Sequence, residues 1–185
     1  ALLVLFLPLA AVPATGQALL DPLSLTKYVD PLPIPGAMPM AGSNYYEIGA
    51  YEIHQQLHSQ LPPTYLFGYG TSQETASYPA ATIVAQRGVP IDIKWTNNLG
   101  FNHPVSFAFD PTIMGAETTT GIPITAHVHG AEVEPQSDGG PLTWFTPGGA
   151  EKGPDWKKEV YHYANTQLAS TIWYHDHAFG FTRHN

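Results

Sequence analysis

Residues 89–97 read VPIDIKWTN, and this stretch decides the fold class. From Val89 to Trp95, apolar residues alternate with polar or small ones, which is the pattern of a strand with one buried face. Working outward, we expect further strands at 45–57, 82–86, 105–109, 122–128, 157–163 and 171–174, the first with a bulge near Gly49. Several short strands separated by turn residues predict an all-β sandwich or barrel with antiparallel pairing.

The composition supports this prediction and excludes several functions. Hydrophobic residues make up 43% of the 185 residues and charged residues 12%, which argues against a disordered chain. The 17 glycines and 18 prolines argue against a helical bundle. A net charge of −8 with only seven Lys and Arg makes nucleic acid an unsuitable partner. The chain has no cysteine, so it can form neither a disulfide nor a cysteine-ligated metal site.

The N-terminal residues predict an exported protein. Residues 1–11 are apolar but too few to span a bilayer, so we expect no membrane span. Ala14 and Gly16 are small residues spaced as at a cleavage site, and we interpret 1–16 as the remnant of a signal peptide of a secreted or extracytoplasmic protein. We expect a proline-rich arm and a first strand over 17–79, then a β domain over 80–185 that is truncated at its C-terminal end.

Four of the nine histidines form two close pairs, His127-Val-His129 and His175-Asp-His177. On a strand, residues i and i+2 project from the same face, about 6.7 Å apart at Cα. Imidazole nitrogen suits copper, zinc, iron or nickel. One pair could hold a single ion, or two facing pairs could hold a multinuclear site. The five unpaired histidines are expected to be structural: His54, His58, His103, His162 and His184.

Several motifs together resemble those of the multicopper oxidases. ITAHVHG at 124–130 and WYHDH at 173–177 are similar to two copper motifs of that family. The similarity is closest to the branch of spore-coat laccase, bilirubin oxidase and phenoxazinone synthase. It extends over LTKYVDPLPIP at 25–35, QLHSQLPPT at 56–64, SDGGPLTWF at 137–145 and GPDW at 153–156.

The resemblance implies an all-β fold, a cupredoxin-like Greek-key β-sandwich with a proline-rich N-terminal arm. It also implies that this chain is the first cupredoxin domain of a laccase-like oxidase. It implies that His127 binds type 2 copper, that His129 and His175 share one type 3 copper, and that His177 binds the other. Asp138 matches a catalytic aspartate that assists proton delivery to bound oxygen. The same residue is also well suited to form a turn before Gly139.

The resemblance also implies what this chain lacks. The trinuclear copper cluster of the family has eight histidine ligands, and this chain supplies four of them. The other ligands would come from missing C-terminal cupredoxin domains, and the type 1 copper requires a cysteine that this chain does not contain. The full enzyme would use O2 and a small electron donor such as a phenol, a bilirubin-like tetrapyrrole, an aminophenol or a metal ion. We expect this fragment alone to be inactive.

Two alternatives stay open. A cupin would hold Mn or Fe with His127, His129 and Glu134, in a motif that begins at Gly121. A non-catalytic, secreted copper-binding β-sandwich would explain the missing cysteine without truncation. The first alternative requires Glu134, rather than the second histidine pair, to face the first pair.

If the chain is a fragment, we also expect the loop at 132–155, with Trp144, Phe145 and Trp156, to present an exposed apolar surface.

Overall fold

The computed structural model describes residues 19–110, 112–113 and 118–185. The predicted signal segment 1–16 lies outside the described residues. The chain divides into two units, 1–31 and 32–185. In the first unit, a short 3-10 helix, η1 (Pro22–Ser24), begins after Asp21, whose carboxylate accepts a hydrogen bond from the Leu23 amide at 2.9 Å. No helix among the described residues is long and apolar enough to cross a membrane.

The second unit is built on a four-stranded sheet with the order β2-β1-β3-β5. Its strands are β1 (Tyr45–Gln55), β2 (Thr64–Gly70), β3 (Ile91–Asn97) and β5 (Val160–Tyr163). β3 confirms the predicted alternation, because every second residue from Ile91 to Asn97 is buried. β1 and β3 run parallel, whereas we expected antiparallel pairing throughout; the other two contacts in the sheet are antiparallel. We expected the β domain to begin at residue 80. The sheet contains strands from both sides of this position, with β1 and β2 before it and β3 and β5 after it.

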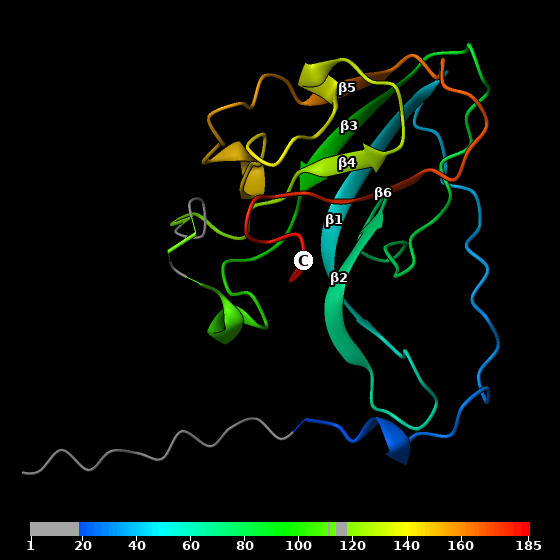
Figure 1. Ribbon diagram of the computed structural model, residues 1–185, viewed down its shortest axis with the longest axis vertical. Helices are drawn as coiled ribbons and strands as arrows, with labels where there is room; N and C mark the ends of the chain where they lie inside the picture. The colour runs from blue at the N-terminus through cyan, green and yellow to red at the C-terminus, as the bar shows by residue number, and fades with distance from the viewer. Residues whose placement is uncertain (1–18, 111, 114–117) are drawn as a thin grey trace, which may run out of the picture. The chain divides into compact units, whose positions relative to one another are not determined.

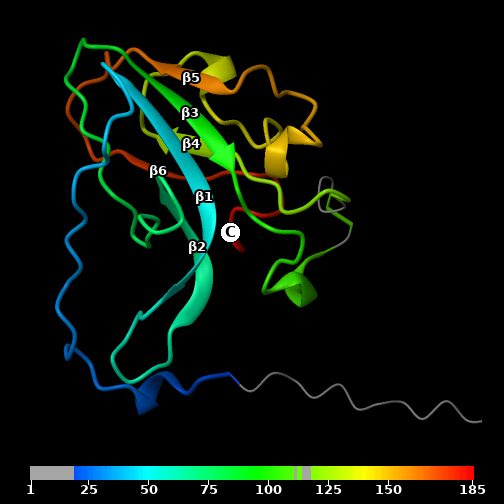
Figure 2. The ribbon, with the colours of Figure 1, turned by 180° about the vertical axis from the view of Figure 1, so that it is seen from behind.

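A second, two-stranded sheet of β4 (Ala126–His129) and β6 (Trp173–Asp176) forms the other layer. In Figure 1, β4 and β6 lie in front of the four-stranded sheet, and in Figure 2 they lie behind it. The hydrophobic core fills the space between the layers. It combines Ile48, Ile93 and Trp95 from the first sheet with Ile124 and Ala126 from the second layer. The all-β sandwich predicted from the sequence is therefore confirmed.

Three details of the predicted strands are wrong. Residues 105–109 contain a 3-10 helix, η2 (Ser106–Ala108), which begins where the Ser106 amide bonds the His103 carbonyl. Residues 82–86 form only one bridge, between Ala37 and Thr82, and no strand. No bulge occurs at Gly49, since the pairing of β1 is continuous with both neighbours.

Strand β2 was not predicted, because it contains glycines and follows two prolines. These glycines are required by packing. A Cβ at Gly68 would lie 2.7 Å from Ile53 Cδ1, and a Cβ at Gly70 would lie 2.5 Å from the Ala76 backbone. The segment that follows β2 therefore packs directly onto the strand. The described part of the proline-rich stretch 17–42 forms no strand and takes part only in isolated bridges at Ala37 and Gly42.

The segment 132–155 packs against the sandwich through its aromatic residues. Phe145 is buried and exchanges two backbone hydrogen bonds with Ile124, of 2.9 and 3.1 Å. Trp144 and Trp156 are partly buried, and Lys152 Nζ lies 3.8 Å from the ring centroid of Trp156. The expectation that this segment presents Phe145 as exposed apolar surface is therefore wrong. Two short 3-10 helices, η3 (Pro135–Ser137) and η4 (Pro147–Gly149), lie within it.

Candidate metal centre

The alternation of β4 and β6 separates the histidines from the core. Ala126 of β4 and Asp176 of β6 are buried. Their sequence neighbours His127 and His175 lie on the opposite face. The two strands are antiparallel, and His127 pairs directly with His175, while His129 pairs with Trp173. Directly paired residues have their Cβ atoms about 4.5–5.5 Å apart. The period of the strands and their register therefore place His127, His129 and His175 on the outer face of the second layer.

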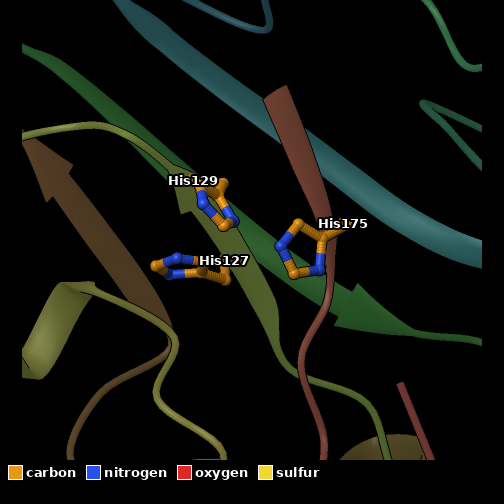
Figure 3. Close-up of side chains that lie close together, drawn as sticks. All are labelled: His127, His129 and His175. Carbon is orange, nitrogen blue, oxygen red and sulfur yellow. The ribbon is translucent and has the colours of Figure 1, made fainter. Parts of the chain in front are cut away.

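The four imidazole rings lie next to one another. The His127 ring centroid is 5.7 Å from that of His129, 5.4 Å from that of His175 and 4.6 Å from that of His177. His129 and His175 are 5.7 Å apart, and His175 and His177 are 5.5 Å apart. Figure 3 shows His127 and His129 on one strand, with His175 beside them on the other. One ligand nitrogen from each of these three residues lies within 4.8 Å of the other two.

Backbone carbonyls orient three of the rings. Nδ1 of His127 bonds the backbone carbonyl of Asp138 at 2.5 Å. Nδ1 of His175 bonds the backbone carbonyl of its neighbour Asp176 at 2.6 Å, and Nδ1 of His177 bonds that of Gly139 at 3.0 Å. A carbonyl oxygen can only accept, so in each ring Nδ1 carries the proton and donates it. A neutral imidazole with this tautomer has its lone pair on Nε2. Such bonds orient metal-binding histidines and raise their basicity.

His175 has the environment of a metal ligand. Its Nε2 is buried and has no hydrogen-bond partner among the described residues. Burial lowers the pKa of His175, and the neighbouring histidines lower it further, against the bond to Asp176, which raises it. The ring is therefore held neutral, the state in which imidazole binds a metal. An orphaned, buried nitrogen that points into a cluster of histidines fits a metal ion.

Asp138 lies at the rim of the cluster. Its Oδ1 is 3.5 Å from Nδ1 of His127, and its side chain is 41% exposed. Its backbone also forms the turn that we considered as the alternative, since it ends η3 and is followed by Gly139 at φ +70°. A Cβ at Gly139 would lie 1.9 Å from the Ala126 carbonyl oxygen. The turn therefore packs closely against β4, which brings two backbone carbonyls to the histidine rings.

The remaining histidines lie outside the cluster. His54 contacts Tyr65 in the neighbouring strand, with ring centroids 5.2 Å apart. His103 and His184 contact Phe109, at 4.7 and 5.0 Å between ring centroids. Nδ1 of His162 bonds an Asp92 carboxylate oxygen at 2.8 Å.

The position of Glu134 discriminates against a cupin site. Its carboxylate accepts a hydrogen bond from Ser137 at 2.8 Å and also contacts the Lys158 ammonium group. The contact with Lys158 is the main cause that lowers the pKa of Glu134. The side chain that faces His127 across the strand pair is His175. The geometry therefore matches the arrangement of two facing histidine pairs.

Sequence reasoning missed two residues behind the cluster, Asp176 and Asn185. The sequence motif assigned no role to Asp176, which separates His175 from His177. It is buried, and burial raises its pKa to about 7, although hydrogen bonds from Thr125, Asn185 and Ala178 lower it. The period of two along a strand could have predicted this position, because the residue between two outward histidines must point inward. No local pattern indicated Asn185, which contacts Asp176 across nine residues.

Comparison with curated proteins finds close similarity to multicopper oxidases. The chain is 39% identical to Multicopper oxidase LPR1 homolog 5 of Oryza sativa subsp. japonica over 95% of this chain and 29% of that protein. It is 39% identical to a laccase of Bacillus subtilis (strain 168) over 88% of this chain and 32% of that protein. The chain thus spans about a third or less of the curated relatives it matches. No protein-family model matches it.

Solved structures show the same fold. A multicopper oxidase from Campylobacter jejuni, described as a metallo-oxidase, superposes with a TM-score of 0.55 over 82% of this chain and 26% of that chain, at 20% identity. At this identity the likeness bears on the fold alone. The two β-layers around one core thus match the cupredoxin-like sandwich that the sequence motifs implied.

Proposed function

Because this chain is homologous to the multicopper oxidases, we propose that it supplies half of the histidine ligands of a trinuclear copper cluster in a laccase-like oxidase. The ligands are His127, His129, His175 and His177. The observation that carries the proposal is the convergence of His127, His129 and His175, whose ligand nitrogens lie within 4.8 Å of one another.

The donor set fits copper. Imidazole nitrogen suits copper, and its neutral form is the one that binds. Three of the rings direct Nδ1 to a backbone carbonyl, which leaves Nε2 available. When bound, copper would accept electrons one at a time and deliver them to oxygen. We carry over from the family that His127 serves type 2 copper, that His129 and His175 share a type 3 copper, and that His177 serves the other.

The chain's own residues would orient the ligands and move protons. The Asp138 and Gly139 carbonyls hold two rings in place from the turn after η3. Asp138 would pass protons to the oxygen site, because its carboxylate is partly exposed and lies 3.5 Å from Nδ1 of His127. Proton delivery is required, since reduction of one O2 to two waters consumes four protons together with four electrons.

In the whole protein, four one-electron oxidations of a phenolic or similar donor would supply the electrons for one O2. The chain has no cysteine, so the type 1 copper that accepts electrons from the donor would be bound by residues outside it. The remaining cluster ligands would come from further cupredoxin domains. We also propose that the protein is secreted, on the basis of the apolar N-terminal residues followed by small residues.

Copper binding by the 185-residue chain tests the ligand assignment. We expect one Cu²⁺ to bind at His127, His129 and His175, as measured by calorimetric titration and electron paramagnetic resonance. The double variant His127→Ala/His175→Ala should bind no stoichiometric Cu²⁺, and His177→Ala should reduce the affinity less. His54→Ala is the matched control, because His54 contacts Tyr65 rather than the cluster. Unchanged Cu²⁺ binding by the double variant would contradict the assignment.

Oxygen uptake tests the assignment of activity to the whole protein. We expect the copper-treated chain to consume no O2 with a phenolic donor, because four histidines cannot hold three coppers from one side. Steady O2 consumption that disappears in His127→Ala/His175→Ala would show that this chain suffices for catalysis.

A further inference from the structure

The side chain of Asp176 points away from the histidine cluster. It lies between His175 and His177 in sequence, so the alternation of the strand directs it toward the inner side of the layer. Asp176 is 9% exposed. A buried carboxylate is costly unless hydrogen bonds satisfy its oxygens. The partners of this group therefore indicate why the site tolerates it.

The Asp176 carboxylate bonds the backbone beside both histidine pairs. Oδ1 accepts a hydrogen bond from the Thr125 amide at 2.9 Å, two residues before His127. Oδ2 accepts one from the Ala178 amide at 3.2 Å, the residue directly after His177. One side chain thus connects the start of β4 to the end of β6, on the face opposite the rings.

Asn185 holds this carboxylate in place. Its Nδ2 donates to Oδ2 of Asp176 at 3.0 Å and to the Pro123 carbonyl at 2.9 Å. Its Oδ1 lies 3.1 Å from Nε2 of His103. Because the Val105 amide donates to Nδ1 of His103 at 3.1 Å, Nε2 carries the proton and donates to Asn185. The amide of Asn185 therefore has partners on both ends, and its orientation is fixed.

These contacts matter because the ladder between β4 and β6 is short. It ends at the pair Ala126 and Asp176, so His177 lies outside it. The position of His177 depends on its own amide, which bonds the Thr125 carbonyl at 2.8 Å, and on its ring, which bonds Gly139. Thr125 is held in turn by Asp176. A change in the carboxylate would therefore move His127 and His177 relative to each other.

We propose that Asp176 and Asn185 form a positioning pair that fixes the two histidine elements relative to each other for metal binding. The proposal rests on the proposed function, because it assumes that the histidines are the ligands. Neither residue touches the metal. Residues that orient metal ligands commonly affect metal affinity by about 10–100-fold.

Cu²⁺ affinity of the full 185-residue chain tests the positioning pair. We expect Asp176→Ala to weaken Cu²⁺ binding by about 10–100-fold and to change the electron paramagnetic resonance parameters of bound Cu²⁺. Asn185→Ala should weaken binding less, and the double variant should bind no more weakly than Asp176→Ala, because both act through one carboxylate. Asp155→Ala, the same substitution at an exposed aspartate, is the matched control.

Wild-type affinity and unchanged resonance parameters in folded Asp176→Ala would overturn the proposal, as would strictly additive effects in the double variant. If Asp176→Ala does not fold, Asn185→Ala decides by the same measures, since it keeps the carboxylate and removes only its contact.

Nuclear magnetic resonance of the metal-free protein separates this proposal from the proposed function. In the wild type, the Nδ1 protons of His127 and His177 should exchange slowly with solvent, and in Asn185→Ala they should exchange faster. This result would support the positioning pair even if the wild type bound no Cu²⁺, which would contradict the proposed function alone. If the histidine ring resonances and the exchange rates of the Nδ1 protons were unchanged in both Asn185→Ala and Asp176→Ala, the positioning pair would be overturned.

Discussion

The two β-layers are stabilised in different ways. In the four-stranded sheet, β1 pairs with β2 and β3 over seven and six residue pairs, and its inner face is apolar. In the two-stranded layer, β4 and β6 share four pairs. This layer relies on buried polar contacts, such as that of Thr125 with Asp176. It is also bonded to the four-stranded sheet by the Asn97 amide of β3, which donates to the carbonyls of Ile122 and Phe145.

This difference separates stability from precision. Apolar packing is strong and non-directional, so it stabilises the fold without setting each side chain's orientation. Hydrogen bonds contribute little net stability but fix geometry, and a broken one leaves a costly buried group. In the layer that carries the histidines, hydrogen bonds therefore fix the orientation of the side chains. This layer packs on a sheet that provides most of the apolar stabilisation.

Removal of Trp95 should have the largest effect on stability. Its ring is 3% exposed and contacts both Tyr69 and Tyr174, with centroids 5.6 and 5.8 Å away. Trp95→Ala leaves a cavity between the layers, and we expect it to lower the free energy of unfolding by about 3–5 kcal/mol. Urea denaturation of the metal-free protein measures this change.

Trp173→Ala sharpens the comparison, because the same side chain is removed from the other layer. Trp173 is 54% exposed and stacks on His175, with ring centroids 4.1 Å apart. Trp173 also stacks on His129, with centroids 5.4 Å apart, and the loss of these contacts by a half-exposed ring should cost about 1 kcal/mol. A cost as large as that of Trp95→Ala would mean that the two-stranded layer is not the weaker support.

Gly139→Ala should come next and should act on the histidine layer. Its φ of +70° strains any L side chain, and the new Cβ would lie 1.9 Å from the Ala126 carbonyl oxygen. Gly148→Ala is a matched control, with φ +63° and no atom within 4 Å of the added Cβ. We expect about 1–2 kcal/mol of destabilisation for the control and about 1–3 kcal/mol more for Gly139→Ala, as measured by thermal unfolding. Equal losses would show that the turn after η3 can move away from β4.

Alternation along the chain predicted the larger part of the fold and the cluster. It placed the buried face of β3 correctly, and the spacing of His127 and His129 placed both rings on one face of β4. Both features depend only on the geometry of one strand. The parallel pairing of β1 and β3 depends on how distant segments meet, and no local pattern carries that information.

The contacts of the residues behind the cluster were not predictable for the same reason. Asp176 contacts Thr125 across 51 residues, and Asn185 contacts His103 across 82. An aspartate between two histidines is compatible with a ligand, a spacer or a buried acceptor. Strand β2 was missed because its glycines indicate a turn when taken alone, whereas here they allow the following segment to pack closely.

Tyr163→Phe should have an intermediate effect, because it leaves a buried donor without an acceptor. The Tyr163 hydroxyl accepts a hydrogen bond of 3.1 Å from Nε1 of Trp95 in the core. Its loss should cost about 1–3 kcal/mol, as measured by urea denaturation. In Tyr174→Phe the group left behind is the partly buried carbonyl of Ala81, to which water has access, so about 1 kcal/mol is expected. A larger cost for Tyr174→Phe would contradict this ranking.

The smallest effect should come from an exposed carboxylate, Asp92, which contrasts with the buried Asp176. Asp92 and His162 are direct partners in the ladder of β3 and β5, with a 2.8 Å contact and side chains 51% and 45% exposed. A double-mutant cycle with Asp92→Ala and His162→Ala should give a coupling energy of about 0.2–1 kcal/mol, because water and salt screen the exposed pair. The same cycle on Asp176 and Asn185, measured above pH 7 where Asp176 is ionised, should give about 1.5–3 kcal/mol, since a buried carboxylate depends on its hydrogen-bond donors. If the exposed pair coupled as strongly as the buried one, burial would not be what distinguishes the two layers.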